Sequence, residues 1–210
     1  MGTHQEQPTR SQKPNEEETI LSEGRVDKQY QWEQKLKQLE TLGDGLGKGL
    51  DNGIKEAVAV IQLFGILTRQ SCQGHLNWGD AAPWIDIDLP LDIYALGQRR
   101  RELVDQLDSL EEGTAEFEEV SQEERLMWHE ERRLEALELK KTFVLLEEFY
   151  RERHVPYDER LIMDGRGRLT NQGSMLQPGE DEARRGKNLY RYQREMKAFT
   201  EFLKQKFFSQ

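Results

Sequence analysis

The sequence contains a single cysteine, Cys72, among 210 residues. One cysteine excludes an internal disulfide, and it excludes the zinc fingers and iron–sulfur clusters that draw several thiolates from one chain. No apolar run reaches the roughly 18 residues of a membrane span, and the first residues lack the apolar core of a secretory signal. These absences predict a protein of a reducing compartment, which we expect to be the cytoplasm, without membrane association.

Hydrophobic residues are also scarce, at 35% of the chain against 33% charged residues, with a mean hydropathy of −0.89. Globular proteins usually have more apolar residues, so part of this chain is expected to be a solvated helix or a tail. The net charge is −10 and the pI about 5.1. Nucleic acid is therefore not an expected partner, because non-specific binding to it depends on neutralising phosphates.

The first part of the chain is expected to be a tail followed by a small α/β unit. Residues 1–25 carry too few apolar side chains to offset the entropy of ordering, which predicts disorder. A short helix is expected over 28–42. The glycine-rich residues 43–53 then form a hinge, since they lack the spacing and the hydroxyl of a phosphate loop.

The unit itself is expected over 26–92. Asp51 or Asn52 is expected to cap a helix whose apolar stripe ends at Gly65. A strand over 66–72, a glycine turn and an alternating strand over 82–89 complete it.

The remainder, 93–210, is expected to be helical with a short hairpin near 160–170. A helix ends at Gly113, and a second one runs from Ser121 to Arg153, with Ser121 and Glu124 resembling a capping box. Asp164-Gly165 is a hairpin turn signal. After Pro178-Gly179 comes a helix whose apolar residues recur every three or four positions: Leu189, Tyr192, Met196, Phe199, Leu203 and Phe207.

These patterns predict an α+β fold that is mainly helical. A small α/β unit joins two long antiparallel helices and a C-terminal helix that packs as part of a bundle. The hairpin either caps that bundle or adds strands to the small sheet.

Cys72 and His75 are the strongest candidates for chemistry. The end of a strand delivers the thiol, and the glycine turn brings an imidazole back within three residues. Such a pair can bind a divalent metal, or the imidazole can deprotonate the thiol. Asp86 and Asp88 share one face of the next strand with Trp84, and we expect this face to complete a ligand site.

A purely structural interpretation stays open for the same residues. A single cysteine after a strand is often a small buried hydrophobe. In that case His75 satisfies backbone groups of the turn, and Asp86 and Asp88 form the solvent face of an edge strand.

The core Thr68-x-x-Ser71-Cys72-x-Gly74-His75, followed by Pro83-Trp84-Ile85, resembles a group of small uncharacterised bacterial and phage proteins. The resemblance implies a bacterial protein but no activity. The Ser-Cys-Gly core also resembles a motif of the wybutosine-synthesis methyltransferases that act on tRNA, although these have arginine at the position of His75.

Two functional hypotheses follow from the sequence. The first is a module for protein interaction or assembly, in which the amphipathic helices bind a protein partner or form a homo-oligomer. The alternative is a ligand- or metal-binding module, which includes the case of an enzyme, centred on Cys72 and His75.

Overall fold

A computed structural model describes residues 16–43, 48–77, 79–176 and 181–210 of the chain. These residues form five α-helices and a small four-stranded antiparallel sheet, so the predicted mainly helical α+β class is confirmed. Two turns of 3₁₀ helix, Tyr157–Glu159 and Gln172–Leu176, flank the second hairpin. No helix in the described ranges combines the length and the apolar character that crossing a bilayer requires.

The N-terminal helix is longer than the sequence indicated. Helix α1 spans Glu16–Glu40, so the second part of the tail expected over 1–25 is helical, and residues 1–15 lie outside the described residues. The C-terminal half of α1 is anchored by Trp32 and Leu39, which are both buried.

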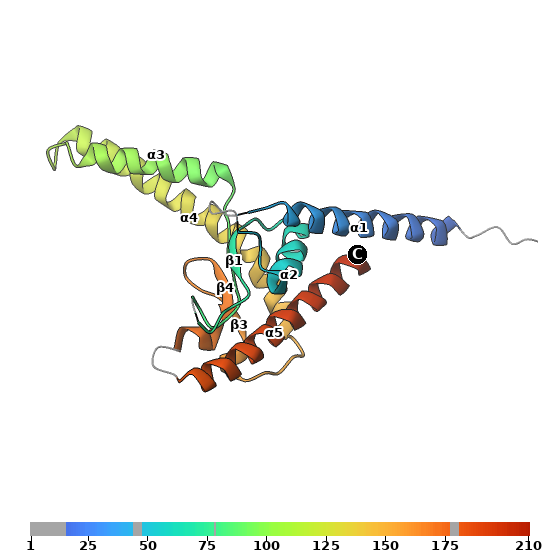
Figure 1. The fold of residues 1–210 in the computed structure, drawn as a ribbon. Coiled ribbons are helices and arrows are strands. Elements are labelled where there is room, and N and C mark those ends of the chain that lie inside the picture. The colour runs from blue at the N-terminus through green and yellow to red at the C-terminus, as the bar shows by residue number, and fades with distance from the viewer. Residues whose placement is uncertain (1–15, 44–47, 78, 177–180) are drawn as a thin grey trace, which may run out of the picture.

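Helix α2, Asn52–Leu63, begins where the sequence predicted and buries Ile54, Val58 and Ile61. It forms the centre of the body, because α1 and the C-terminal helix both pack against it (Figure 1). Of the glycine-rich hinge, residues 44–47 lie outside the described residues, and Gly43 and Gly49 on either side of them form an antiparallel bridge.

The sheet joins strands from both halves of the chain in the order β1-β2-β4-β3, with every pair antiparallel. Strands β1 (Thr68–Cys72) and β2 (Trp84–Ile87) come from the expected α/β unit. Strands β3 (Leu161–Met163) and β4 (Arg168–Asn171) are the predicted hairpin. Of the two roles left open for the hairpin, it takes the second and extends the sheet that begins before residue 92.

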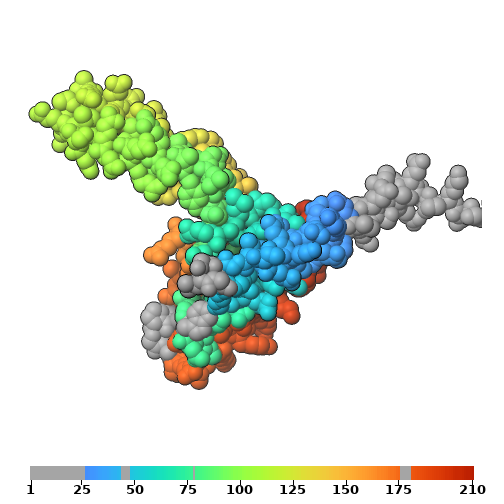
Figure 2. Space-filling model, turned by 45° about the horizontal axis from the view of Figure 1, so that its top comes forward, coloured from blue at the N-terminus to red at the C-terminus, as the bar shows by residue number. Residues whose placement is uncertain are grey.

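Helices α3 (Leu91–Leu107) and α4 (Ala115–Tyr150) form a long antiparallel pair that projects from the body as an arm (Figures 1 and 2). At 36 residues, α4 is about 54 Å long. It begins earlier than predicted. The Thr114 hydroxyl accepts a hydrogen bond from the Phe117 amide and caps the helix, so the capping box proposed at Ser121 lies inside it. We define the arm as residues 91–135 and the body as the remaining described residues.

The C-terminal helix α5, Glu182–Ser209, confirms the predicted stripe. Tyr192, Met196, Phe199, Leu203 and Phe207 are buried and Leu189 is half-buried. The helix packs on α2, α1 and the end of α4. It therefore forms the bundle with the body helices and not with the arm.

Candidate metal centre

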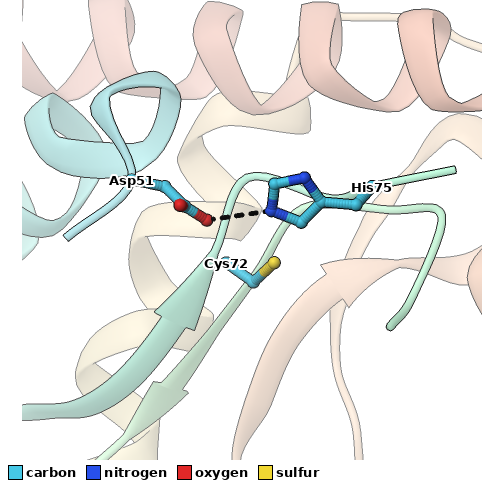
Figure 3. Close-up of side chains that lie close together, drawn as sticks. All are labelled: Asp51, Cys72 and His75. Carbon is cyan, nitrogen blue, oxygen red and sulfur yellow. Dashed lines mark hydrogen bonds and ion pairs between the residues drawn. The ribbon is translucent and has the colours of Figure 1, made fainter. Parts of the chain in front are cut away.

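Three side chains converge at the edge of the body, where β1 ends close to the start of α2. Asp51, Cys72 and His75 each direct a ligand atom inward, and these atoms all lie within 4.8 Å of one another (Figure 3). The Asp51 Oδ2 atom lies 3.2 Å from His75 Nε2. The sequence predicted the pairing of Cys72 with His75 but not the third member.

Asp51 occupies the N-cap position of α2 without capping it through its side chain. Its carboxylate instead accepts a hydrogen bond of 3.3 Å from the Gln73 amide and contacts His75. The Gln73 Oε1 atom accepts a hydrogen bond of 2.9 Å from the Gly53 amide, which is one of the amides at the start of a helix that have no partner within the helix. Gln73 thus takes the capping role that the N-cap residue Asp51 would normally have, and this exchange leaves the Asp51 carboxylate turned toward the site.

Glycine at position 53 permits this exchange. A Cβ atom there would lie 2.4 Å from Gln73 Oε1. Any other residue at this position would push the Gln73 side chain away from the helix start.

The turn between Cys72 and His75 is fixed from both sides. Gly74 has φ of +85° and is buried, and a Cβ atom there would lie 2.7 Å from the backbone carbon of Ala82 and 2.6 Å from Leu189 Cδ1. The Gln193 side chain of α5 donates a hydrogen bond of 2.9 Å to the Gln73 carbonyl. Because packing and hydrogen bonds hold the turn, the thiol and the imidazole lie on the same side of it.

The spacing of the three ligand atoms is close to what one metal ion requires. A tetrahedral zinc ion holds oxygen and nitrogen ligands at about 2.0–2.2 Å, which places them about 3.3 Å apart. The observed Asp51–His75 separation of 3.2 Å matches this value. A zinc–sulfur distance of about 2.3 Å places the sulfur about 3.5 Å from the other two ligand atoms, and Cys72 Sγ lies within 4.8 Å of both.

Electrostatics at the site favour a cation. Burial acts to raise the pKa of Asp51, but hydrogen bonds from the Gln73 amide and the His75 ring outweigh it and hold that pKa below its usual value. Burial, with the nearby Asp51 carboxylate, raises the pKa of the Cys72 thiol. The Gly74 amide donates a hydrogen bond of 3.4 Å to Cys72 Sγ, which acts to lower this pKa but does not outweigh burial. Without a cation the thiol therefore stays protonated, and this weakens the alternative in which Cys72 is a nucleophile.

A cavity of about 360 Å³ borders the cluster, and Asp51 and Cys72 form part of its wall. Leu39, Leu42 and Val58 supply apolar surface, while Lys48 and Arg69 supply positive charge. The Lys48 Nζ atom lies 3.7 Å from Asp51 Oδ1. A small molecule in this cavity can reach the ligand atoms of Asp51 and Cys72.

Trp84, one of the predicted ligand-binding residues, also lines this cavity. It pairs with Cys72 across the β1–β2 ladder, and the Arg168 guanidinium stacks on its other side at 3.9 Å from the ring centroid. The structure therefore brings Trp84 next to the site as a wall of the cavity.

Asp86 and Asp88 do not join the cluster, contrary to the sequence-based expectation. Asp86 accepts hydrogen bonds from Arg168 at 2.7 and 3.2 Å. Asp88 accepts a hydrogen bond of 2.6 Å from the Tyr94 hydroxyl. The reason is the antiparallel register: Cys72 lies opposite Trp84, so each later residue of β2 lies farther from the turn, by about 3.3 Å per residue.

Comparisons with models of known protein families, with curated proteins and with solved structures find no match for this chain. The resemblances drawn from the Ser-Cys-Gly core therefore stay predictions. The assignment of the site depends on the geometry of Asp51, Cys72 and His75.

Proposed function

We propose that the protein binds a divalent transition metal of the zinc class through Asp51, Cys72 and His75. The observation that carries this proposal is the convergence of three ligand atoms of different chemistry within 4.8 Å, on segments fixed by packing. A carboxylate, a thiolate and an imidazole are the three side-chain types that zinc accepts. A divalent cation would also offset the negative charges that Asp51 and a deprotonated Cys72 bring together.

The number of protein ligands favours an open metal site. Structural zinc sites use four protein ligands, whereas sites that bind or activate a small molecule use three and leave one position for water or substrate. Here the cluster has three protein ligands, and two of them, Asp51 and Cys72, line a cavity of about 360 Å³. The proposed function is therefore metal-dependent binding of a small molecule, with metal-assisted hydrolysis as the reaction class that such a site can support.

Cobalt titration tests the metal site directly. Cobalt bound to a thiolate gives a sulfur-to-metal charge-transfer absorption, so we expect such a band to saturate at one ion per chain. Zinc should displace the cobalt and abolish the band. Proton release on binding should accompany it, because the Cys72 thiol is protonated beforehand.

Matched carboxylate variants give the control. Asp51→Asn, Cys72→Ser and His75→Ala should each weaken zinc binding by at least about 100-fold, which exceeds the loss from removing groups that only orient a ligand. Asp88→Asn removes a carboxylate that directly follows β2 and lies outside the cluster, and it should leave the affinity unchanged. Equal losses in Asp88→Asn and Asp51→Asn would contradict the proposal.

Protein assembly is a second candidate function, and the exposed apolar side chains of α3 and α4 are the observation that favours it. More than half of the large hydrophobic side chains exposed in the described residues lie on α3 or α4. Exposed apolar side chains mark an interaction site where they gather into one patch. Sedimentation of the full chain tests this function, because a strictly monomeric species that copurifies with no other protein would argue against it.

A further inference from the structure

Strand β1 is an edge of the sheet, because among the described residues it pairs with β2 alone. The outer side of an edge strand carries backbone N–H and C=O groups that no neighbouring strand satisfies. Such an edge can pair with another extended chain, unless the protein covers it or places charges along it. The outer side of β1 is therefore a surface on which an extended segment can be added to the sheet.

The cavity beside the metal centre runs along this edge. All five residues of β1, Thr68–Cys72, contribute to its lining. Because successive residues of a strand point to opposite faces of a sheet, a cavity lined by five in a row meets the strand at its edge. The helices α1 and α2 and the segment between them add apolar side chains to the lining: Leu39, Leu42, Leu50 and Val58. An extended ligand would find both backbone partners and apolar surface here.

Arg69 supplies a cationic group at a distance from the metal centre. It precedes Cys72 by three residues, which is about 10 Å along a strand. The register of β1 against β2 shifts around Arg69, and such irregularities redirect side chains next to functional sites. Its guanidinium lies 3.9 Å from Asp86 Oδ2, beyond hydrogen-bonding distance, because Arg168 already donates to both oxygens of that carboxylate. Arg69 can therefore bind a carboxylate of a ligand.

We propose that the ligand of this site is a short peptide that adds to β1 as an antiparallel strand, with its C-terminal carboxylate on Arg69. This inference rests on the metal-dependent function proposed above and names the substrate class of the same site. Strand β1 ends at Cys72, close to Asp51 (Figure 3). An antiparallel peptide anchored at Arg69 thus directs its amino end toward the metal centre. The span of about 10 Å corresponds to three extended residues.

A peptide accounts for more of the site than a compact anion does. Its alternating N–H and C=O groups match those of the edge strand, which supply affinity, and its apolar side chains can occupy the apolar part of the cavity, which supplies selectivity. A compact anion would use the guanidinium alone. At the other end Lys48 Nζ lies 3.7 Å from Asp51 Oδ1, and a divalent ion bound there supplies a Lewis acid next to the peptide.

Hydrogen exchange and cobalt absorption of the full chain test the docking. The probe is a library of tripeptides with free termini and apolar residues at the first two positions, and the control is the same library with amidated C-termini. Saturation with the free-carboxylate library should slow exchange of the outward-facing β1 amides at least about 10-fold, because binding stabilises the closed state. The amidated library should bind at least about 10-fold more weakly, as expected for loss of a hydrogen bond to a charged group.

Arginine variants test the carboxylate anchor. Arg69→Gln should weaken binding of the free-carboxylate library at least about 10-fold and abolish its advantage over the amidated library. Arg166→Gln is the matched control, because Arg166 is exposed at the turn between β3 and β4 and does not line the cavity. It should leave both affinities unchanged. Thermal denaturation of each variant checks that the fold is intact.

Two results would overturn this inference. If neither library slows exchange in residues 68–72, β1 is not the docking edge. If the two libraries bind equally, or Arg69→Gln changes nothing, the carboxylate does not bind Arg69. In both cases a cobalt band that saturates at one ion per chain would leave the metal site in place. Protection of β1 with a preference for the free carboxylate, but without any cobalt band, would support peptide docking and contradict the metal site.

Discussion

The body and the arm differ in how many apolar side chains they bury. The body concentrates the apolar residues in one core that includes Phe149, Phe199 and Phe207. The arm has few buried residues: Ile93, Gly97 and Leu103 on α3 and Val120 on α4. The overall hydrophobic content of 35% is therefore an average of two unlike regions.

Ion pairs also differ between the two regions. In the body, the Glu195 carboxylate is 1% exposed and accepts hydrogen bonds from Arg153 and Tyr150 at 2.6–3.0 Å. In the arm, Arg100 bridges Glu124 and Glu131 across the two helices while remaining partly exposed. Buried pairs are costly to break, whereas exposed pairs contribute little, so the body should be the cooperative unit and the arm the weaker one.

The largest effect should come from the centre of the body. Phe199→Asp should lower the free energy of unfolding by about 5 kcal/mol, because it removes a buried ring and desolvates a charge. Phe199 is 1% exposed and its ring packs 5.2 Å from that of Phe149. Urea denaturation measures the loss. The control Phe143→Asp, at a site 49% exposed on α4, should cost under about 1 kcal/mol.

Gly74 and Gly113 have nearly the same positive φ, so substituting each by alanine distinguishes the cost of a steric clash from the cost of the backbone conformation. Gly74→Ala should cost about 3 kcal/mol, because a positive φ and a clash with the Ala82 backbone both oppose the new Cβ. Gly113 in the arm has φ of +84° but open space where a Cβ atom would lie. Gly113→Ala should therefore lower the free energy of unfolding by only about 1 kcal/mol. Equal melting temperatures for the two variants would show that the turn beside Cys72 is not tightly packed.

Arg100→Ala should loosen the arm without affecting the body. We expect a loss of about 1 kcal/mol, because the side chain is 28% exposed and its ion pairs are partly screened. Hydrogen exchange of the α3 amides should accelerate while that of α2 amides stays constant. Faster exchange in both helices would mean that arm and body unfold together.

His75→Ala should have a small effect on folding, below about 1 kcal/mol, if the imidazole serves a ligand. Its ring is half-buried, and its Nε2 atom lies 3.2 Å from the Asp51 carboxylate. Thermal denaturation in the presence of a chelator measures this effect without metal. Severe unfolding of the variant would support a structural role for His75.

The smallest expected effect is on the rate at which Cys72 is chemically modified. A raised pKa lowers the thiolate fraction at any pH below it, so iodoacetamide should react with Cys72 more slowly at pH 8 than with a free cysteine. Denaturant should restore the normal rate, and zinc should slow the native reaction further. A native rate equal to that of free cysteine would mean that the thiol is neither buried nor shielded.

Much of the fold could be predicted from local patterns. The stripe of α5, the strand over 82–89 and the Asp164-Gly165 turn each depend on residues close together in the chain, and each is found near its predicted place. The start of α4 was placed too late, because the Ser121 pattern satisfies the rules of a cap that Thr114 already provides. The joining of the β3–β4 hairpin to β2 depends on contacts between distant segments, which periodicity does not encode.

The site was predicted only in part, for a related reason. Cys72 and His75 are three residues apart, so a glycine turn was enough to indicate that they meet. Asp51 looked like an ordinary helix cap, and its role depends on Gln73 taking over the capping of α2. Asp86 and Asp88 were assigned to the site because the strand face was correct, but the register that separates them from His75 could not be derived from alternation alone.

The order of strands in the sheet has a consequence for folding. Neighbouring strands β2 and β4 are separated in the chain by the whole of α3 and α4. Closing a loop of that length costs entropy that grows only slowly with its length, and an antiparallel helix pair formed early from local contacts would shorten the effective loop. Shortening both arm helices by matching turns should therefore preserve the sheet and leave its assembly rate nearly unchanged.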